Sequence, residues 1–436
     1  MRASSRIWHP MTQHALSGPA IEIDSARGAY LYTKDERAII DGISSWWVIT
    51  HGHCHPHIVQ AVQEQAGRLE QVIFAGFTHE PAEKLTEKLI YSTDRHLEFA
   101  FYSDSGSTAV EVGLKMAIGY FQHVGQPRTK IVALEGGYHG DTFGAMSAGS
   151  RSIFNKAYEP YLFDVTHLPC PSKDPGKTLQ VYEDLLKAEG KNVAALILEP
   201  LVKGADGMKI YEAKTLRTLH DMCAEYGVLL IADEVMTGFG RTGTKFACEQ
   251  AGIAPDIMCL SKGLTGGFLP MGATLCSRDI YNAFYHKDRE KTFFHSTSFS
   301  GNPLACTAAI ANLELWQREP VMKQIDYIAR SHQKAKRWFA ARPDVSDVRT
   351  LGTIFALDIP DDINGYLSQI GPILYDIFLE HDVLLRPIGN TVYVLPPYCA
   401  NQADLDRVYD VLWRALDQLR NMAESATENN QGGVAA

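Results

Sequence analysis

The stretch Val228-Leu-Leu-Ile-Ala-Asp-Glu234 gives the clearest indication of the fold. Its nearly continuous apolar run is typical of a strand buried on both faces of a parallel sheet, and it ends at two acids. Two similar runs, Lys130–Leu134 and Val193–Leu198, alternate with helical patterns such as Ser107–Phe121. This alternation predicts an α/β fold with helices on both faces of a mostly parallel sheet. Ligands of such sheets bind at the carboxyl ends of strands, so these acids are expected to face a site, although strand-end acids can also simply contact water.

A lysine follows the next expected strand. Ile257–Leu260 is a short apolar run, and Ser261-Lys-Gly-Leu-Thr-Gly-Gly267 comes directly after it. Burial at a strand end lowers the pKa of a lysine and makes it nucleophilic. Taken alone, Lys262 could equally be an exposed lysine before a turn. Paired with Asp233, it suits pyridoxal phosphate (PLP), which requires a lysine for its aldehyde and a carboxylate for its pyridinium nitrogen.

Two further segments are candidates for holding such a cofactor. Ser103-Asp-Ser-Gly-Ser-Thr108 directly precedes the strongest helical pattern, and the free N–H groups at a helix N-terminus bind phosphate. An ordinary serine N-cap would have the same sequence. Tyr138 lies among glycines in the loop Glu135–Asp141, where its ring could stack on the pyridine face or fill the core.

The overall composition argues against several classes of protein. The chain has 436 residues, 45% of them apolar, which is ordinary for a globular protein. Its formal net charge of −10, without a run of Lys or Arg, argues against a nucleic-acid partner. No stretch reaches the roughly 18 apolar residues that a membrane helix requires. None of the eight cysteines lies in a CxxC pair, which favours reduced thiols and a cytoplasmic location over a disulfide framework.

The expected elements divide the chain into four parts. Residues 1–55 form an N-terminal segment with a hairpin at 21–40, and this segment is expected to join a small domain. Residues 56–318 form the large α/β domain, and residues 319–422 predict a smaller α+β domain. The polar tail at residues 423–436 is expected to be disordered.

Two patterns imitate other kinds of site. Gly238-x-Gly-x-x-Gly243 matches the dinucleotide fingerprint, with Asp256 further on, but five residues separate its first glycine from the expected strand. His51-Gly-His-Cys-His-Pro-His57 resembles a metal-binding run, but it lacks the second ligand pair that a zinc site requires. No metal is therefore expected, and a nicotinamide-dependent oxidoreductase is kept only as an alternative function.

Several motifs together carry a resemblance to a known family. They are Ser105-Gly-Ser107, Gly137-Tyr-His-Gly-Asp141, Ala232-Asp-Glu-Val235, Gly238-Phe-Gly-Arg-Thr-Gly243, Lys262 and Gly301-Asn-Pro-Leu-Ala305. In this order they resemble the class III aminotransferases, from Trp8 to about residue 415. The resemblance implies the PLP-dependent transferase architecture of fold type I, with a large domain built on a mostly parallel seven-stranded sheet.

The resemblance also implies roles for individual residues. Lys262 would be the Schiff-base lysine, Asp233 the partner of the pyridinium nitrogen and Tyr138 the stacking ring, and these three are the expected catalytic residues. Ser298 would reach the phosphate from a neighbouring subunit, which implies a homodimer with shared active sites. The full expected cofactor site is Ser105, Gly106, Ser107, Tyr138, Asp141, Asp233, Lys262 and Ser298.

Other segments resemble the class III aminotransferases of biotin biosynthesis: Trp8-His-Pro10, Asp41-Gly-Ile-Ser-Ser-Trp-Trp47, Leu385-Arg-Pro-Ile-Gly389, Tyr393 and Pro396-Pro-Tyr398. Those enzymes convert 8-amino-7-oxononanoate into 7,8-diaminononanoate by ping-pong transfer through pyridoxamine phosphate, usually with S-adenosylmethionine as donor. The resemblance implies that Trp46 and Trp47 line a substrate tunnel, that Arg386 binds the substrate carboxylate and that Arg241 lies near the site mouth. Ser296 and Tyr393 complete the expected substrate site.

One departure from the family pattern concerns the donor. Met11 stands where these enzymes have a tyrosine that shapes the donor pocket, so lysine stays open as an alternative donor. A related aminotransferase acting on an ω-amine or a diamine is a second alternative, against which Trp46 and Trp47 argue.

Overall fold

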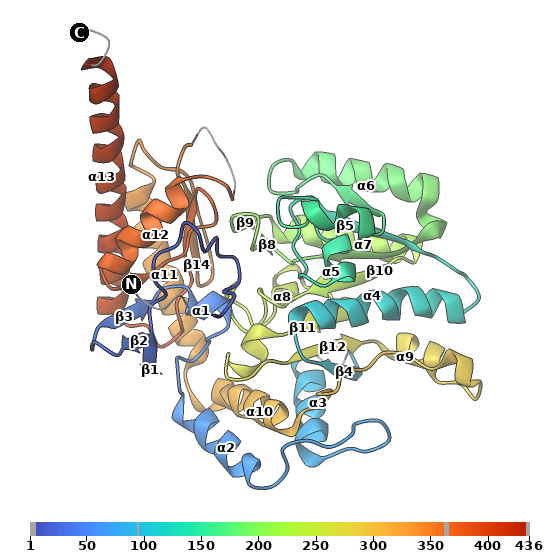
Figure 1. Ribbon diagram of the computed structural model, residues 1–436. Coiled ribbons are helices and arrows are strands. Elements are labelled where there is room, and N and C mark those ends of the chain that lie inside the picture. The colour runs from blue at the N-terminus through green and yellow to red at the C-terminus, as the bar shows by residue number, and fades with distance from the viewer. Residues whose placement is uncertain (1–5, 94–95, 362–365, 433–436) are drawn as a thin grey trace.

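A seven-stranded sheet forms the centre of the large domain in the computed structural model, which describes residues 6–93, 96–361 and 366–432 (Figure 1). β12 runs antiparallel to β4 and β11, and the other four neighbouring pairs are parallel. The predicted α/β fold with a mostly parallel sheet is thereby confirmed. Across the sheet the strands are β4 (Phe99–Ser103), β12 (Gly272–Cys276), β11 (Ile257–Leu260), β10 (Leu229–Asp233), β7 (Val193–Leu198), β5 (Lys130–Leu134) and β6 (Val165–Leu168).

Successive side chains of the central strands point into two different apolar layers. Leu196 of β7 belongs to the layer that holds α6 (Pro175–Glu189) and α7 (Ala213–Tyr226). Its neighbour Ile197 packs in the opposite layer, against α4 (Gly106–His123). Because helices cover both faces, the strands carry apolar residues at every position, and this is the pattern that made them recognisable in the sequence.

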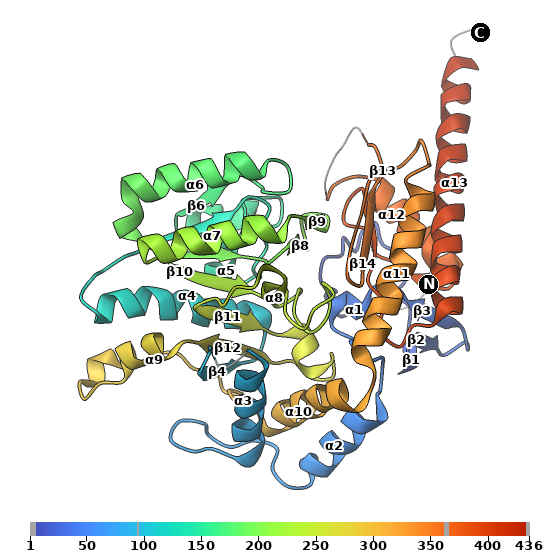
Figure 2. The same ribbon diagram turned by 180° about the vertical axis from the view of Figure 1, so that it is seen from behind.

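Helices also cover both faces of the sheet near its β4 edge. There α3 (Glu80–Ser92) and α10 (Pro303–Arg318) pack on the face opposite α4 (Figure 2). The chain also contains shorter helices and strands: α1 (Ser44–Trp47), α2 (Pro56–Ala66), α5 (Phe143–Ala148), α8 (Cys248–Ala251), α9 (Arg278–Phe284), β8 (Val202–Lys203) and β9 (Lys209–Ile210). Among the described residues, no helix is both long and apolar enough to cross a bilayer.

The small domain combines the two ends of the chain. Its elements are a three-stranded antiparallel sheet of β13 (Ser346–Leu351), β14 (Ile354–Asp358) and β16 (Thr391–Val394), and the helices α11 (Val321–Phe339), α12 (Ile370–Glu380) and α13 (Gln402–Gly432). The N-terminal strands β1 (Ile23–Arg27), β2 (Tyr30–Thr33) and β3 (Ala38–Asp41) join it through the parallel pairing of β3 with β15 (Val383–Leu384). This pairing supports the proposed division of the chain at residues 55 and 318, in which the N-terminal segment belongs with the small domain.

The C-terminal tail differs from expectation. Residues 423–432 continue helix α13 instead of being disordered, and residues 433–436 lie outside the described residues. Extending an existing helix requires no new nucleus, which is the unfavourable step of helix formation. The stretch also contains alanine and glutamate, which are good helix formers, and no proline.

Candidate active site

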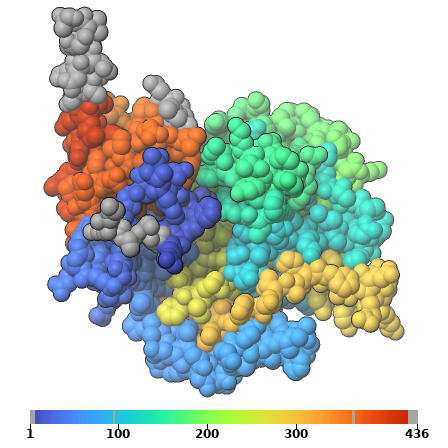
Figure 3. Space-filling view, in the orientation of Figure 1, coloured from blue at the N-terminus to red at the C-terminus, as the bar shows by residue number. Residues whose placement is uncertain are grey.

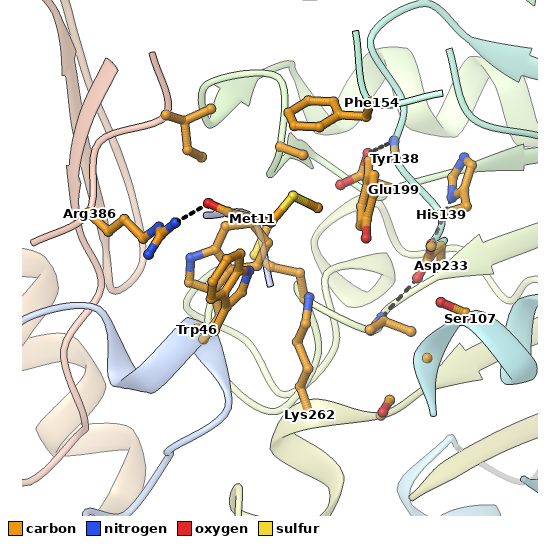
Figure 4. A pocket seen from close by; sticks show the side chains of 18 of the residues that line it. Met11, Trp46, Ser107, Tyr138, His139, Phe154, Glu199, Asp233, Lys262 and Arg386 are labelled. Atoms are coloured by element: carbon orange, nitrogen blue, oxygen red, sulfur yellow. Dashed lines mark hydrogen bonds and ion pairs between the residues drawn. The ribbon is translucent and has the colours of Figure 1, made fainter. Parts of the chain in front are cut away.

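Two neighbouring strands bring Asp233 and Lys262 to one edge of the large sheet. β10 ends at Asp233, which lies opposite Cys259 of the parallel strand β11. Lys262 follows β11 in the one-turn 3-10 helix Lys262–Thr265, with a φ of 45°. Both side chains line a cavity of about 210 Å³, and Figure 4 shows them converging on it.

The surroundings of Lys262 favour its neutral form. Burial lowers the pKa of Lys262 to about 8, while the negative charges of Asp233 and Glu199 act in the opposite direction. The Nζ atom lies 4.5 Å from the centre of the Trp47 ring. An amine that titrates near neutral pH can act as a nucleophile toward a carbonyl carbon and can also accept and return a proton.

A buried histidine orients the Asp233 carboxylate. His139 Nδ1 lies 2.7 Å from Asp233 Oδ2, and Val235 N donates to Oδ1 at 3.1 Å. Burial opposes charge on His139, but the hydrogen bond and the negative charge of Asp233 outweigh it and raise the pKa of the imidazole. These two hydrogen bonds hold the Asp233 carboxylate in a fixed direction toward the cavity.

The N-terminus of α4 faces the same cavity. Gly106 and Ser107 line it from the first turn of the helix. A Cβ on Gly140 would lie 2.1 Å from Ser107 Oγ, and a Cβ on Gly106 would lie 2.7 Å from a methyl group of Val235. These two glycines therefore let three segments meet closely enough to surround a small anion with N–H donors.

Tyr138 lines the cavity between this helix and the carboxylates. Burial raises the pKa of its phenol, and the neighbouring Asp141 raises it further through charge and a hydrogen bond. Asp141 itself lies outside the cavity, where its backbone N–H donates to Ser107 Oγ at 3.2 Å. The Tyr138 ring is thus neutral and fixed at both its backbone and its hydroxyl.

The opposite wall of the cavity comes from the N-terminal segment and the small domain. Trp46, Trp47, Arg386 and Tyr393 all line it, as does Met11. The guanidinium of Arg386 lies 5.1 Å from the Trp46 ring centre and donates to Met11 O at 2.8 Å (Figure 4). In the space-filling view the N-terminal segment, in dark blue, lies at the junction of the two domains (Figure 3).

Five of the expected site residues do not line the cavity. Ser105 is the N-cap of α4 and exchanges hydrogen bonds with Thr108 in a capping box, and Asp141 lies behind Ser107. Ser296 and Ser298 are exposed, in the segment that precedes α10. The fifth residue is Arg241.

Arg241 does not lie at the site mouth. Its side chain is 1% exposed and donates to three backbone carbonyls, those of Trp47 (3.1 Å), Ile49 (2.8 Å) and Pro396 (3.1 Å). It lies behind Trp47 and connects the large domain to both the N-terminal segment and the small domain. The sequence motif identified an important arginine but did not indicate the direction of its side chain.

Several lining residues were not expected from the sequence. Burial raises the pKa of Glu199 to about 7, and its carboxylate accepts from Tyr138 N (3.1 Å) and Gly204 N (2.9 Å). Glu199 directly follows strand β7, so the rule that identified Asp233 would also have identified it. The rings of Phe154, in the large domain, and Tyr366, in the small domain, pack edge to face with their centres 4.6 Å apart. No local sequence pattern indicates this contact.

The dinucleotide-like glycine motif at 238–243 and the histidine run at 51–57 have other roles in the fold. The 238–243 glycines lead into the four-residue helix α8, and Asp256 lies at the opposite end of β11 from Lys262. His53, His55 and His57 lie against Asp41, Glu319 and Glu314, respectively, at 2.8–3.0 Å. In the part of the chain that the structure describes, no three potential ligands gather around a common metal position.

Comparisons with known proteins agree with this fold and geometry. The sequence model of the class-III aminotransferase family matches residues 12–416. The adenosylmethionine-8-amino-7-oxononanoate aminotransferase of Synechococcus elongatus is 45% identical over 96% of this chain and 100% of its own, and that of Helicobacter pylori is 37% identical over 95% and 96%. The crystal structure of the Methanocaldococcus jannaschii enzyme of the same name superposes with a TM-score of 0.91 at 34% identity, covering 95% and 97% of the two chains.

A second solved structure, a PLP-bound amine transaminase from an uncultivated Pseudomonas species, has a TM-score of 0.89 at 29% identity over 96% of this chain and 100% of that one. The fold is that of a PLP-dependent transaminase. The chain belongs to the class III aminotransferase family. This membership excludes the nicotinamide-dependent oxidoreductase that was kept as an alternative.

The lowered pKa of Lys262 predicts how the apo-protein takes up PLP. The uptake rate should rise with pH and reach half of its maximum at about pH 8, because only the neutral amine attacks the aldehyde. Stopped-flow absorbance of the yellow complex measures this rate.

Lys262→Ala should lack both the absorbance and turnover. Lys245→Ala is the matched control, because burial also lowers the pKa of Lys245 to about 8. This variant should take up PLP with an unaltered pH profile. A midpoint near the ordinary pKa of lysine would contradict the assignment.

Proposed function

We propose that this enzyme transfers an amino group from S-adenosylmethionine to 8-amino-7-oxononanoate, giving 7,8-diaminononanoate for biotin synthesis. One observation carries the proposal: a single cavity joins the Lys262 amine to the Arg386 guanidinium, with Trp46 and Trp47 along its wall. Such a site suits a substrate with a carbonyl group at one end of an aliphatic chain and a carboxylate at the other. The relatives named for this reaction support the same assignment.

The residues present fit PLP as the cofactor. The Lys262 amine would bond to the aldehyde, the Asp233 carboxylate would pair with the pyridinium nitrogen, and the ring of Tyr138 would lie on the pyridine face. Gly106 and Ser107 would hold the phosphate with the N–H groups at the start of α4. When bound, PLP supplies an electron-withdrawing ring that stabilises negative charge at the substrate carbon bearing the nitrogen.

The proton transfers belong to Lys262 in this proposal. When its amine is not bonded to the cofactor, Lys262 removes the proton from the carbon that bears the amino group of the donor. It returns a proton to the carbon of the acceptor that receives the amino group. Burial, which lowers the pKa of Lys262 to about 8, makes both directions accessible near neutral pH. His139 remains hydrogen-bonded to Asp233 and holds its carboxylate in place.

The substrate wall discriminates by chain length and charge. The two tryptophans would bury the aliphatic chain of 8-amino-7-oxononanoate, and the fork of Arg386 would hold its carboxylate. Arg386 binds a backbone carbonyl of Met11 in the present structure. A bound carboxylate would replace this neutral acceptor with a charged one, which forms the stronger hydrogen bond.

S-adenosylmethionine is the proposed donor, because the similar enzymes are named for adenosylmethionine and the aromatic wall suits its sulfonium cation. A sulfonium cation over a tryptophan face gains about 0.5–2 kcal/mol, and Trp46 is exposed enough to offer its face. Met11 stands where the biotin-pathway enzymes have a tyrosine, and it lines the cavity beside Arg386.

Supplying the two donors separately tests the reaction. With 8-amino-7-oxononanoate as acceptor, S-adenosylmethionine should give 7,8-diaminononanoate at least about tenfold faster than lysine does, which corresponds to roughly 1.4 kcal/mol of preference. Mass spectrometry of the product measures both rates, with Lys262→Ala as the inactive control. Product from lysine alone would overturn the donor assignment, and product from neither donor would overturn the reaction.

Arg386→Ala tests the carboxylate role. We expect the KM for 8-amino-7-oxononanoate to rise about tenfold to a hundredfold with a smaller change in kcat, since hydrogen bonds to charged groups contribute about 1.5–3 kcal/mol. Arg414→Ala, which removes an exposed arginine of α13, should leave the KM unchanged. An unaltered KM in Arg386→Ala would remove this residue from the substrate site.

A homodimer with shared sites is also part of the proposal. Ser298 lies in a segment that exposes Phe294 and Phe299, and the segment that contains Gln71 exposes Ile73 and Phe77, each of these four side chains being at least 60% exposed. Gln71 Nε2 donates to Ser298 O at 3.0 Å, so the two segments lie side by side. Exposed apolar side chains of this kind favour association with another chain, here a second copy that would receive Ser298 at its phosphate.

Mixed dimers test this sharing. Ser298→Asp would place a negative charge at the partner's phosphate, so both this variant and Lys262→Ala should be inactive as homodimers. Mixing and refolding the two variants should restore about a quarter of wild-type turnover, because half of the dimers then contain one intact site. Full activity of Ser298→Asp alone, or an inactive mixture that sizes as a dimer, would contradict shared sites.

We place the enzyme in the cytoplasm. All eight cysteines are free, six of them buried in the core. Free thiols in this number are typical of a reducing compartment.

A further inference from the structure

The segment that carries the two tryptophans has an unusual backbone. Ser44, Ser45, Trp46 and Trp47 have φ angles of 54°, 45°, 73° and 71°, respectively, so four consecutive non-glycine residues are left-handed. L-amino acids disfavour this region because Cβ approaches the following carbonyl oxygen, and it is normally visited by single residues. A run of four therefore persists only where the surroundings hold it in place.

A single buried carboxylate makes most of the polar contacts at the start of this left-handed turn. Asp41 is 0% exposed. Its Oδ1 accepts from Ser45 N at 2.9 Å and from Ile43 N at 3.3 Å, and its Oδ2 accepts from Ser45 Oγ at 2.7 Å. His53 Nε2 lies 2.8 Å from the same Oδ2 and limits the rotation of the carboxylate. Asp41 thus binds both the backbone and the side chain of the second residue in the turn.

The position of Asp41 in the sheet also relates the turn to Arg386. Asp41 is the last residue of β3 and pairs with Leu384 of β15, and Gly42 N donates to Leu384 O at 3.1 Å. Arg386 follows β15 by two residues. The turn with its tryptophans and the segment with the arginine therefore leave the same pair of strands side by side.

We propose that Asp41 is a positioning residue for the substrate site, whose carboxylate holds the left-handed turn and so fixes both tryptophans. The turn places the Trp46 ring 5.1 Å from the Arg386 guanidinium and the Trp47 ring 4.5 Å from Lys262 Nζ. Relaxation of the turn to ordinary right-handed or extended backbone would move both rings together. The proposal rests on the substrate role given to these residues above, whereas the hold on the turn is independent of which substrate binds.

Asp41→Asn in the cofactor-loaded enzyme tests the proposal by hydrogen–deuterium exchange. The amides of Trp47, Val48 and Ile49 donate within the turn at 2.9–3.1 Å. We expect the peptide that covers residues 44–49 to exchange at least tenfold faster in the variant. The KM for 8-amino-7-oxononanoate should rise at least fivefold, and by more than kcat falls, because substrate placement is lost while the Lys262–Asp233 pair is untouched.

Asp404→Asn is the matched control. Asp404 is another buried carboxylate, 3% exposed, that accepts a hydrogen bond from Asn401 N at 2.9 Å at the start of α13. Its variant should leave the 44–49 exchange and the KM unchanged. Unchanged 44–49 exchange in Asp41→Asn, or equal effects in both variants, would overturn the proposal. Exchange requires no substrate, so it decides the role of Asp41 even if the acceptor proves to be a different one.

Two further variants extend the test, and the first of them keeps it decisive if Asp41→Asn folds poorly. Ser45→Ala removes one hydrogen bond to the carboxylate and should raise the exchange about threefold, whereas unchanged exchange would overturn the proposal. In Asp41→Asn/Ser45→Gly, glycine adopts positive φ without the Cβ conflict, so at least part of the protection and of the KM should return. If the exchange and the KM of the double variant equal those of Asp41→Asn, then Asp41 does not act by holding the left-handed turn.

Discussion

The parallel pairing of β10 with β11 is the constraint on which the active site depends. It brings the Asp233 carboxylate, at the end of β10, and the Lys262 amine, just after β11, to one edge of the sheet. Both strands are covered by helices on each face, so their ends cannot shift independently without opening the core. The helix N-terminus of α4 and the Tyr138 loop add the anion cradle and the ring contact around this pair.

Burial acts differently on the ionisable groups of this one cavity. It lowers the pKa of Lys262 to about 8 and raises that of Glu199 to about 7, because each group loses hydration in its charged form. His139, although equally buried, has a raised pKa because it is hydrogen-bonded to Asp233. The result is an amine that can accept and release a proton near neutral pH, next to a carboxylate that a buried histidine holds in place.

The walls of the cavity come from two different parts of the molecule. The residues that fit PLP come from the large domain, whereas Met11, Trp46, Arg386 and Tyr393 come from the N-terminal segment and the small domain. Arg241 connects the two parts by donating to the carbonyls of Trp47, Ile49 and Pro396. Under the proposed function, changes in the N-terminal segment and the small domain would alter substrate preference and leave the lysine–carboxylate pair as it is. Solved structures with a similar fold include both an amine transaminase and an adenosylmethionine-8-amino-7-oxononanoate aminotransferase.

The sequence by itself determined the strands around the site, because strands buried on both faces carry continuous apolar runs. It also indicated the Lys262–Asp233 pair, because each residue lies within two positions of the end of such a run. It did not determine the direction of Arg241, the contact between Phe154 and Tyr366, or the left-handed turn at Trp46, since each depends on residues that are distant along the chain. The helical continuation of α13 was also missed, because polar composition alone does not show whether an existing helix will extend into it. Local periodicity reports which face of an element is buried, whereas the direction of a loop side chain is set by the hydrogen-bond acceptors that other segments bring to it, and only the tertiary structure supplies those.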